Sequence, residues 1–209
     1  MKTFYKFLLK IALRAHSFSY KLISYLAIKN ENGLHPKHRL IGYHDFFINN
    51  IDPNETVLDI GCGNGSLAKD VASHAKSVLG VDIDKNLVEK AKRKNSAPNL
   101  TYRALDATKD LSNEKFDVII MSNVLEHIEH RVEFLKKIRP LATKFLFRVP
   151  MIDREWVTLY KKELGLDYRL DTTHFTEYTW KQFKDEFEQA GYSIQSHSIQ
   201  FGEIWAVIK

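Results

Sequence analysis

Cysteine and long apolar runs are both scarce in this sequence. It has one cysteine among 209 residues, so it cannot form an internal disulfide, which suits a reducing compartment. No apolar run reaches the roughly eighteen residues that a membrane-spanning helix requires. The apolar stretch at residues 7–15 is interrupted by Lys10 and Arg14, unlike the core of a signal peptide. We therefore expect a cytoplasmic protein.

An excess of positive charge is absent outside the N-terminal segment. Residues 1–44 carry eight Lys and Arg against one acid, whereas the rest of the chain carries 23 against 25. The net charge of +5 is thus a property of the N-terminal segment. A basic surface spread over the whole protein, as in many nucleic-acid-binding proteins, is not expected.

The N-terminal segment has the pattern of a basic amphipathic helix. Lys2, Lys6, Lys10 and Arg14 recur every four residues, and apolar residues gather on another face. Such a helix is typical of membrane-surface binding, so one interpretation is peripheral contact of residues 1–20 with an anionic membrane. The other interpretation is a helix that packs on the main domain or covers its site.

Apart from that arm, which we place at residues 1–45, the chain is expected to form one domain, residues 46–209. Short apolar segments alternate with segments of helical spacing, which predicts a doubly wound, mostly parallel α/β sheet. The five expected parallel strands are 56–60, 77–82, 100–106, 116–122 and 144–150. Residues 193–201 and 203–209 are too close for an intervening helix, so they are expected to pair as an antiparallel hairpin.

The first expected strand runs into the glycine-rich stretch VLDIGCGNG, residues 57–65. In doubly wound folds, ligands bind at this carboxyl edge of the sheet. Gly61, Gly63 and Gly65 would let the backbone approach a ligand and turn sharply into a helix. Ser66 stands where the dinucleotide pattern GxGxxG has its last glycine, which weakens a pyrophosphate interpretation.

A second part of the pattern lies at the ends of the next two strands. Asp82 follows Gly61 by 21 residues, where its carboxylate would reach the ribose hydroxyls of a nucleoside above the turn. Ile83 would offer an apolar wall to the adenine ring. Asp106 and Ala107 would receive the far edge of that ring. The combination predicts a nucleoside site.

The stretches VLDIGCGNG, GVDID at 80–84, LDA at 105–107 and FDVIIMSNVLEHI at 116–128 resemble the successive motifs of class I S-adenosylmethionine-dependent methyltransferases. The similarity covers roughly residues 50–209. It implies a seven-stranded sheet of that fold that ends in an antiparallel hairpin, S-adenosyl-L-methionine as the cofactor, and methyl transfer as the activity.

The resemblance also implies a set of cofactor-binding residues: Asp59, Gly61, Gly63, Gly65, Asp82, Ile83, Asp106, Ala107 and Asn123. In the family pattern, Gly61 and Gly63 cradle the methionine moiety, and Asp59 orients the cradle or the methionine ammonium. Asp82 would hold the ribose, and Asn123 would lie beside the donor at the end of the fourth strand.

The chemistry predicts a general base when the acceptor is a hydroxyl, because that group must lose a proton. His127, just after the fourth strand, and His174, before the last helix, are the candidates, although either could be a helix-terminal hydrogen-bond partner. Glu126 beside His127 permits a metal interpretation. Neighbours on a helix diverge by about 100°, however, so we predict no metal site.

A long connection at about residues 150–178 precedes the last helix, and connections of this length are usually functional. Its arginines and aromatic residues suit a sugar, phosphate or aromatic acceptor, or equally anchor the loop. We expect a small-molecule acceptor, methylated on an oxygen of a glycan, lipid-linked or quinone-type substrate. A protein or RNA acceptor is the alternative. The slightly acidic main domain argues against RNA, and we expect no nucleic-acid partner.

Overall fold

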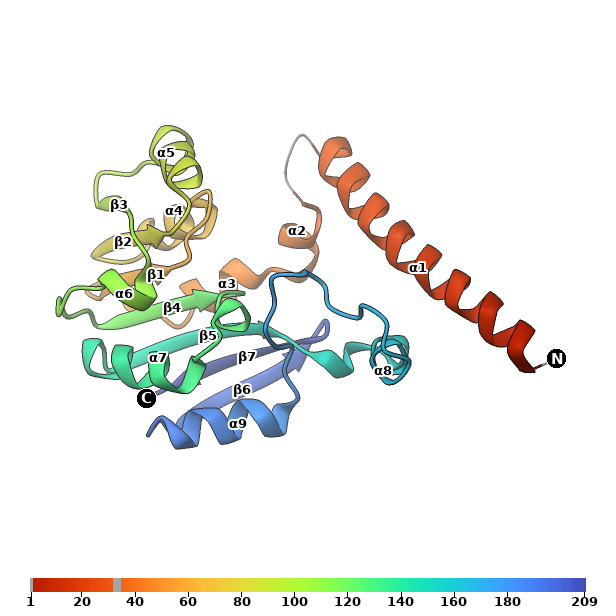
Figure 1. Cartoon of the computed structure of the whole chain (residues 1–209). Coiled ribbons are helices and arrows are strands. Elements are labelled where there is room, and N and C mark those ends of the chain that lie inside the picture. The colour runs from red at the N-terminus through yellow and green to blue at the C-terminus, as the bar shows by residue number, and fades with distance from the viewer. Residues whose placement is uncertain (1, 32–34) are drawn as a thin grey trace. The chain divides into compact units, whose positions relative to one another are not determined.

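The computed structural model describes residues 2–31 and 35–209 of the chain (Figure 1). These residues belong to two compact units, Met1–Tyr43 and His44–Lys209. The larger unit contains all seven strands of the sheet.

Two helices lie in the described part of the N-terminal unit. Helix α1, Lys2–Asn30, has 29 residues and no acidic side chain. Helix α2, Lys37–Ile41, ends at Gly42 in a left-handed conformation with φ of 58°, which a residue without a side chain adopts easily. No helix in the described parts of the chain is both long and apolar enough to cross a membrane.

The larger unit is built on one seven-stranded sheet with the strand order β3-β2-β1-β4-β5-β7-β6. Strands β1 to β5 run parallel, and β7 pairs antiparallel with both β5 and β6. The predicted fold class is therefore confirmed. The strands are β1 Thr56–Ile60, β2 Ser77–Asp82, β3 Leu100–Ala104, β4 Val118–Ser122, β5 Lys144–Pro150, β6 Ile194–Gln200 and β7 Glu203–Ile208.

The centre of the sheet is buried on both faces. In β4, Val118, Ile119, Ile120 and Met121 are each 0% exposed. Because side chains alternate along a strand, a continuously buried run requires cover on both sides. On one face the core cluster includes α7, Arg131–Ile138, and α9, Trp180–Gln189, which Figure 1 shows along the same side of the sheet.

The remaining helices lie before β1, between the strands or in the long insert. Helices are present between the parallel strands, as the helical spacing of those segments predicts, whereas short helices such as α6 were not predicted. The remaining α-helices are α3 Tyr43–Ile48, α4 Ser66–Ala72, α5 Lys85–Lys94, α6 Ala107–Asp110 and α8 Trp156–Glu163. The 3₁₀ turns are η1 Leu125–His127, η2 Arg139–Leu141 and η3 Ile152–Arg154.

Strands β6 and β7 form the predicted antiparallel hairpin at the C-terminal end of the domain. Phe201 and Gly202 form its turn with φ of 52° and 71°, and two left-handed residues match the twist of a two-residue hairpin. Before it, the Thr179 hydroxyl accepts a hydrogen bond from the Gln182 amide at 3.1 Å, as expected for the residue that caps the N-terminus of α9. The Gln182 side chain instead binds Thr176 and Glu186, so only half of a capping box forms.

Candidate functional site

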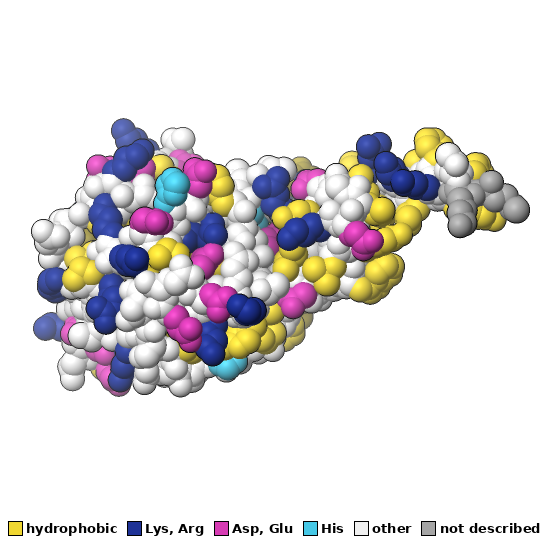
Figure 2. All heavy atoms as spheres, turned by 60° about the horizontal axis from the view of Figure 1, so that its bottom comes forward, with side chains coloured by type: hydrophobic (Ala, Val, Ile, Leu, Met, Phe, Trp, Pro, Cys, Tyr) yellow, Lys and Arg dark blue, Asp and Glu magenta, His cyan; other side chains and the backbone are white. Residues whose placement is uncertain are grey.

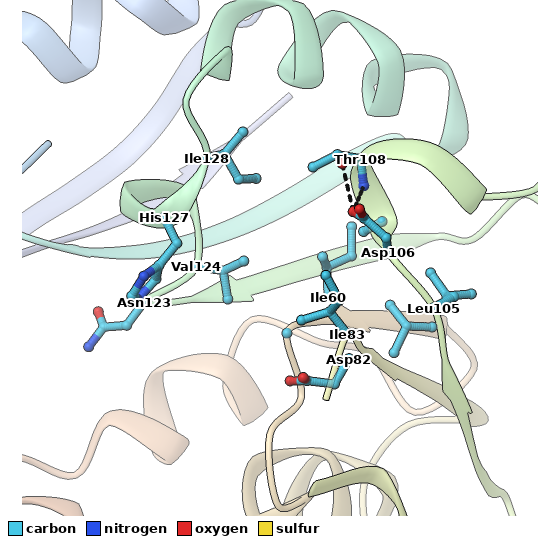
Figure 3. Close-up of a pocket in the computed structure, with 13 residues that line it drawn as sticks. Ile60, Asp82, Ile83, Leu105, Asp106, Thr108, Asn123, Val124, His127 and Ile128 are labelled. Atoms are coloured by element: carbon cyan, nitrogen blue, oxygen red, sulfur yellow. Dashed lines mark hydrogen bonds between the residues drawn. The ribbon is translucent and has the colours of Figure 1, made fainter. Parts of the chain in front are cut away.

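A cavity of about 400 Å³ opens where the carboxyl ends of β1, β2 and β4 meet (Figure 3). This is the sheet edge at which doubly wound folds bind ligands. It is lined by Ile60, Gly61, Val81, Asp82, Ile83, Leu105, Asp106, Ala107, Thr108, Asn123, Val124, His127 and Ile128. Seven of the predicted site residues are therefore brought together here.

The glycine turn meets different neighbours at each glycine. All three residues are left-handed, with φ of 73° at Gly61, 54° at Gly63 and 79° at Gly65. A Cβ at Gly61 would come within 2.3 Å of Val124, and one at Gly65 within 2.3 Å of the Tyr102 hydroxyl. A Cβ at Gly63 would meet nothing within 4 Å. Two glycines thus make room for protein side chains, and Gly63 faces open space.

Asp82 joins the glycine turn to the second strand. Its Oδ2 accepts a hydrogen bond from the Gly63 amide at 2.8 Å, and its Oδ1 accepts one from the Asp84 amide at 2.9 Å. An ionised carboxylate has about four acceptor positions, so Asp82 can still accept from ligand hydroxyls. Ile83 next to it is 70% exposed, a large apolar side chain without cover at the cavity wall.

Asp106 is engaged with the start of α6. Its Oδ1 accepts from the amide and the hydroxyl of Thr108, at 3.0 and 2.6 Å, as Figure 3 shows. Lys109 lies 3.0 Å from its other oxygen. The Thr108 hydroxyl and Lys109 hold the pKa of Asp106 below its ordinary value. Ala107 lines the cavity beside it.

Two polar groups near the cavity are buried without a described hydrogen-bond partner. One is Oδ2 of Asp59, on β1, and burial together with the charge of Asp82 raises the pKa of Asp59 to about 8. The other is Oδ1 of Asn123, a residue in the left-handed region with φ of 56°. Buried polar atoms normally have a hydrogen-bond partner, so a ligand in the cavity could supply one to each of these two oxygens.

The two predicted bases lie side by side although 47 positions separate them in the chain. The rings of His127 and His174 meet edge to face with centroids 4.6 Å apart. His127 Nδ1 is 2.9 Å from the Thr173 hydroxyl, and His174 Nδ1 is 3.2 Å from Oε1 of Glu177. Burial and the neighbouring His174 lower the pKa of His127, while Asp171 opposes this shift. His127 lines the cavity, whereas His174 is buried and does not line it.

Glu126 is the third member of this group. It is 0% exposed, neither carboxylate oxygen has a described partner, and burial raises its pKa to about 8. One donor atom from each of Glu126, His127 and His174 lies within 4.8 Å of the others. The sequence argument against a metal site was that the adjacent residues Glu126 and His127 point in different directions. The structure weakens that argument, because the insert brings His174 close to both of them. That no metal is bound stays a prediction.

The insert between β5 and α9 is held by buried ion pairs. Arg154 binds Glu177 and donates to the Met151 and Tyr168 carbonyls. Arg148, on β5 just before the insert, is buried in a two-bond ion pair with Glu203 of β7, at 2.6 and 2.8 Å. By contrast, Trp156 is 73% exposed, so it does not anchor the insert in the core.

Several residues of the site were not predicted. Val124 and Ile128 follow β4 and look like ordinary core positions in the sequence. In the structure both line the cavity, and Val124 lies directly against Gly61. Thr173 and Glu177 lie in the expected insert, but no sequence pattern pairs them with particular histidines. Conversely, Asp59, Gly63 and Gly65 do not line the cavity itself.

The cavity and its surroundings fit S-adenosyl-L-methionine. Its volume lies in the range of small-molecule sites, about 300 to 1,000 Å³. Asp82 offers a carboxylate with spare acceptor positions, and Ile83 offers an apolar surface. Asp59 and Asn123 have buried oxygens that lack partners. Polar, apolar and glycine positions thus occur together, as a nucleoside with an amino-acid tail requires.

Comparisons with known proteins find methyltransferases. A family model described as a methyltransferase domain matches residues 34–197. The ubiquinone biosynthesis O-methyltransferase of Candida albicans mitochondria is 34% identical over 120 residues, covering 52% of this chain and 36% of that protein. The protein of the same name from Bradyrhizobium diazoefficiens is 27% identical over 146 residues, covering 68% and 58%. The chain thus spans less than two thirds of either relative.

Among solved structures, magnesium protoporphyrin IX methyltransferase from Synechocystis PCC 6803 with bound SAH shares the fold. The TM-score is 0.64 at 22% identity, over 80% of this chain and 81% of that one. The family model covers most of the chain, and the strand order agrees with the predicted fold. The chain therefore belongs to the methyltransferase domain family, and its class is that of the S-adenosylmethionine-dependent methyltransferases.

Proposed function

We propose that this protein transfers a methyl group from S-adenosyl-L-methionine to an oxygen of a small-molecule acceptor of the glycan, lipid-linked or quinone type. The observation that carries the proposal is the position of His127 at the wall of the same cavity as Asp82 and Asn123. A base beside a nucleoside site is what methylation of a hydroxyl requires. The two relatives named ubiquinone biosynthesis O-methyltransferases support oxygen as the acceptor atom.

The donor site of this proposal uses the predicted residues. Asp82 would hold the ribose, Ile83 and Ala107 would border the adenine, and Asp106 would meet its amino group. Gly61, Gly63 and Gly65 would shape the turn against the methionine moiety, with Asp59 and Asn123 close to it. Asp59 and Asn123 fit this role because their buried oxygens lack partners in the described residues.

The chain's own part in the reaction is alignment and proton removal. The bound cofactor supplies an electrophilic methyl group on a sulfonium. Asn123 and His127 lie on the β4 side of the cavity, so an acceptor hydroxyl held between them would be close to the donor. His127 accepts the hydroxyl proton, and its lowered pKa keeps it unprotonated at neutral pH. His174 is the second candidate for this base, because its ring touches that of His127.

A labelled-donor assay tests the proposal. Purified protein is incubated with methyl-labelled donor and, separately, a phenolic quinone precursor, a sugar, a lipid-linked sugar, RNA and a protein mixture. Products are separated and identified by mass spectrometry. Label on a hydroxyl of a small molecule supports the proposal, whereas label only on protein or RNA would establish the alternative acceptor class.

For residues 1–20 we propose peripheral contact with an anionic membrane. Helix α1 exposes Phe4, Phe7, Ile11 and Phe18 by 48 to 68%, and Figure 2 shows apolar and basic side chains beside one another on this helix. The helix has no acidic residue, so two copies would repel each other, whereas anionic lipid would attract it.

Liposome co-sedimentation tests this contact. Full-length protein should pellet with anionic vesicles at low salt and less with neutral ones, and a variant lacking residues 1–20 should stay in the supernatant. A Lys6→Glu/Lys10→Glu variant, which keeps the apolar face, should also lose binding. Equal pelleting of the full-length and truncated proteins would contradict the proposal.

A further inference from the structure

The insert contacts His127 through a short chain of hydrogen bonds that the proposed function does not use. The Thr173 hydroxyl oxygen lies 2.9 Å from His127 Nδ1 and 2.7 Å from Oδ1 of Asp171. The same Oδ1 accepts the Thr173 backbone amide at 2.8 Å. Asp171, Thr173 and His127 therefore form one connected line.

The positions of the protons in this line follow from counting donors. A threonine hydroxyl has one proton, and an ionised carboxylate only accepts. The pKa of Asp171 is held below its ordinary value, chiefly by the hydrogen bonds from Thr173, so the carboxylate is ionised at neutral pH. Two oxygens 2.7 Å apart need a proton between them, and this proton must come from Thr173. The Thr173 oxygen is then an acceptor toward His127.

We propose that Asp171 and Thr173 are positioning residues that hold His127 in the tautomer protonated on Nδ1, so that Nε2 carries the lone pair. An imidazole whose Nδ1 donates to a fixed acceptor has its ring orientation and tautomer set by that bond. The assignment of the tautomer stands on the geometry of these hydrogen bonds and on an ionised Asp171, and it does not depend on the proposed function. Its use, with Nε2 as the atom that takes the acceptor proton, rests on the proposed function.

The neighbouring histidine has the same arrangement. His174 Nδ1 faces Oε1 of Glu177, and Arg154 and the Leu170 amide also donate to that carboxylate. These donors, and above all the positive charge of Arg154, favour the ionised form of Glu177, which can only accept hydrogen bonds. Nδ1 of His174, like Nδ1 of His127, then faces an acceptor and carries a proton. The groups facing His127 are thus His174, Glu126 and the Asp171–Thr173 segment.

A purely structural interpretation is a local turn, since Asp and Thr two residues apart often close one without any ligand. The two interpretations differ in what happens to His127. A turn alone leaves the imidazole tautomer unaffected when the hydroxyl is removed. A positioning role makes the tautomer depend on that hydroxyl.

Long-range ¹H–¹⁵N correlation spectra of ¹⁵N-histidine-labelled protein decide between them. In the wild-type protein at neutral pH, His127 should show a protonated Nδ1 and an unprotonated Nε2, with His127→Gln used for assignment. Thr173→Val, which removes the hydroxyl and keeps the shape, should abolish this pattern, and Thr173→Ser should restore it. Asp171→Ala should shift it too, because the freed hydroxyl can donate to Nδ1. Thr172→Val removes the neighbouring exposed hydroxyl and serves as the matched control.

Single-turnover methyl transfer at saturating donor gives the second measurement. Thr173→Val should lose about ten- to a hundredfold in rate, less than removal of the base itself, with donor affinity unchanged and Thr173→Ser close to wild type. A wild-type His127 protonated on Nε2, or an unchanged tautomer in Thr173→Val, would overturn the inference. A changed tautomer with an unchanged rate would uphold it and instead refute His127 as the base.

Discussion

Asp59 and Glu126 are both buried carboxylic acids whose pKa is raised to about 8, but they belong to differently built sides of the cavity. Asp59 stands on β1, and the charge that acts on it is that of Asp82, 23 residues away on the neighbouring strand. Glu126 follows β4, and the charges around it come from Arg148, Glu203 and Glu177, on β5, β7 and the insert.

The difference is one of sequence distance. On the donor side, the Gly63 amide donates a hydrogen bond to Asp82, 19 residues away at the end of the neighbouring strand. The acceptor side requires the insert to return across the sheet edge to His127. The bond between Gly63 and Asp82 joins consecutive strands, whereas the contact between His127 and Thr173 spans 46 residues and needs the insert in place.

The largest expected effect is on the acceptor side. His127→Ala should slow methyl transfer by about a hundred- to ten-thousandfold, because the acceptor hydroxyl keeps its proton. Donor affinity should change little, since the base acts on the acceptor. Single-turnover rates of His127→Ala and His174→Ala, each at saturating donor, identify which histidine acts. Full activity in both variants would remove the two histidines from the mechanism.

On the donor side, Asp82→Ala should weaken binding of S-adenosylhomocysteine by about 2 to 4 kcal/mol, because hydrogen bonds from ligand hydroxyls to a charged acceptor are lost. Isothermal titration measures this directly. Asp84→Ala is the matched control, since Asp84 caps α5 and does not line the cavity. An unchanged affinity in Asp82→Ala would exclude Asp82 from the site.

The pH dependence of stability, measured together with donor affinity, should distinguish the two buried acids Glu126 and Asp59. The pKa of Glu126 rises from an ordinary 4.5 to about 8 on folding, so the folded state binds its proton more tightly. Its contribution to stability is therefore full below pH 4.5 and is lost as the pH rises to about 8. Glu126→Gln should remove this loss and gain on the order of 4 kcal/mol at pH 8 over wild type, with little gain near pH 4.5.

Urea unfolding of both proteins at several pH values gives the comparison. Asp59→Asn is the counterpart on the donor side, and it should behave similarly in stability. Of the two variants, only Asp59→Asn should also weaken donor binding. A gain for Glu126→Gln that does not vary with pH would contradict the assigned protonation.

Within the glycine turn, Gly61→Ala should destabilise the fold by about 1 to 3 kcal/mol, because the new Cβ meets Val124 in addition to the strain of a left-handed residue. Gly63→Ala meets open space and should cost less stability while still reducing donor affinity. Thermal unfolding and titration of the two variants measure both quantities. A Val124→Ala background should reduce the cost of Gly61→Ala, and additivity of the two changes would refute the contact.

The smallest expected effect is that of a chelator. Since no metal site is predicted, EDTA treatment followed by gel filtration should leave the single-turnover rate unchanged. Zn²⁺ and Mg²⁺ added back should have no effect. Loss of activity with EDTA, restored by one of the ions, would assign Glu126, His127 and His174 as its ligands.

Much of the fold was predictable because its signals are local. Strands β1, β2 and β5 have the predicted bounds, since each is a short apolar run that ends at a turn or a polar residue. Strand β3 ends two residues before its predicted end, because Asp106 begins α6. Hydrophobicity does not report such a capping residue.

The sequence by itself determined the sheet, the glycine turn and the candidate donor residues, because alternation of apolar residues and residues with special backbone conformations act over a few positions. Only the tertiary structure decided that Val124 fills the space above Gly61 and that Arg148 pairs with Glu203. It likewise decided that Thr173 contacts His127. These contacts join segments separated by tens of residues, and their partners are selected by packing and by the pairing of buried polar groups, which no local pattern encodes.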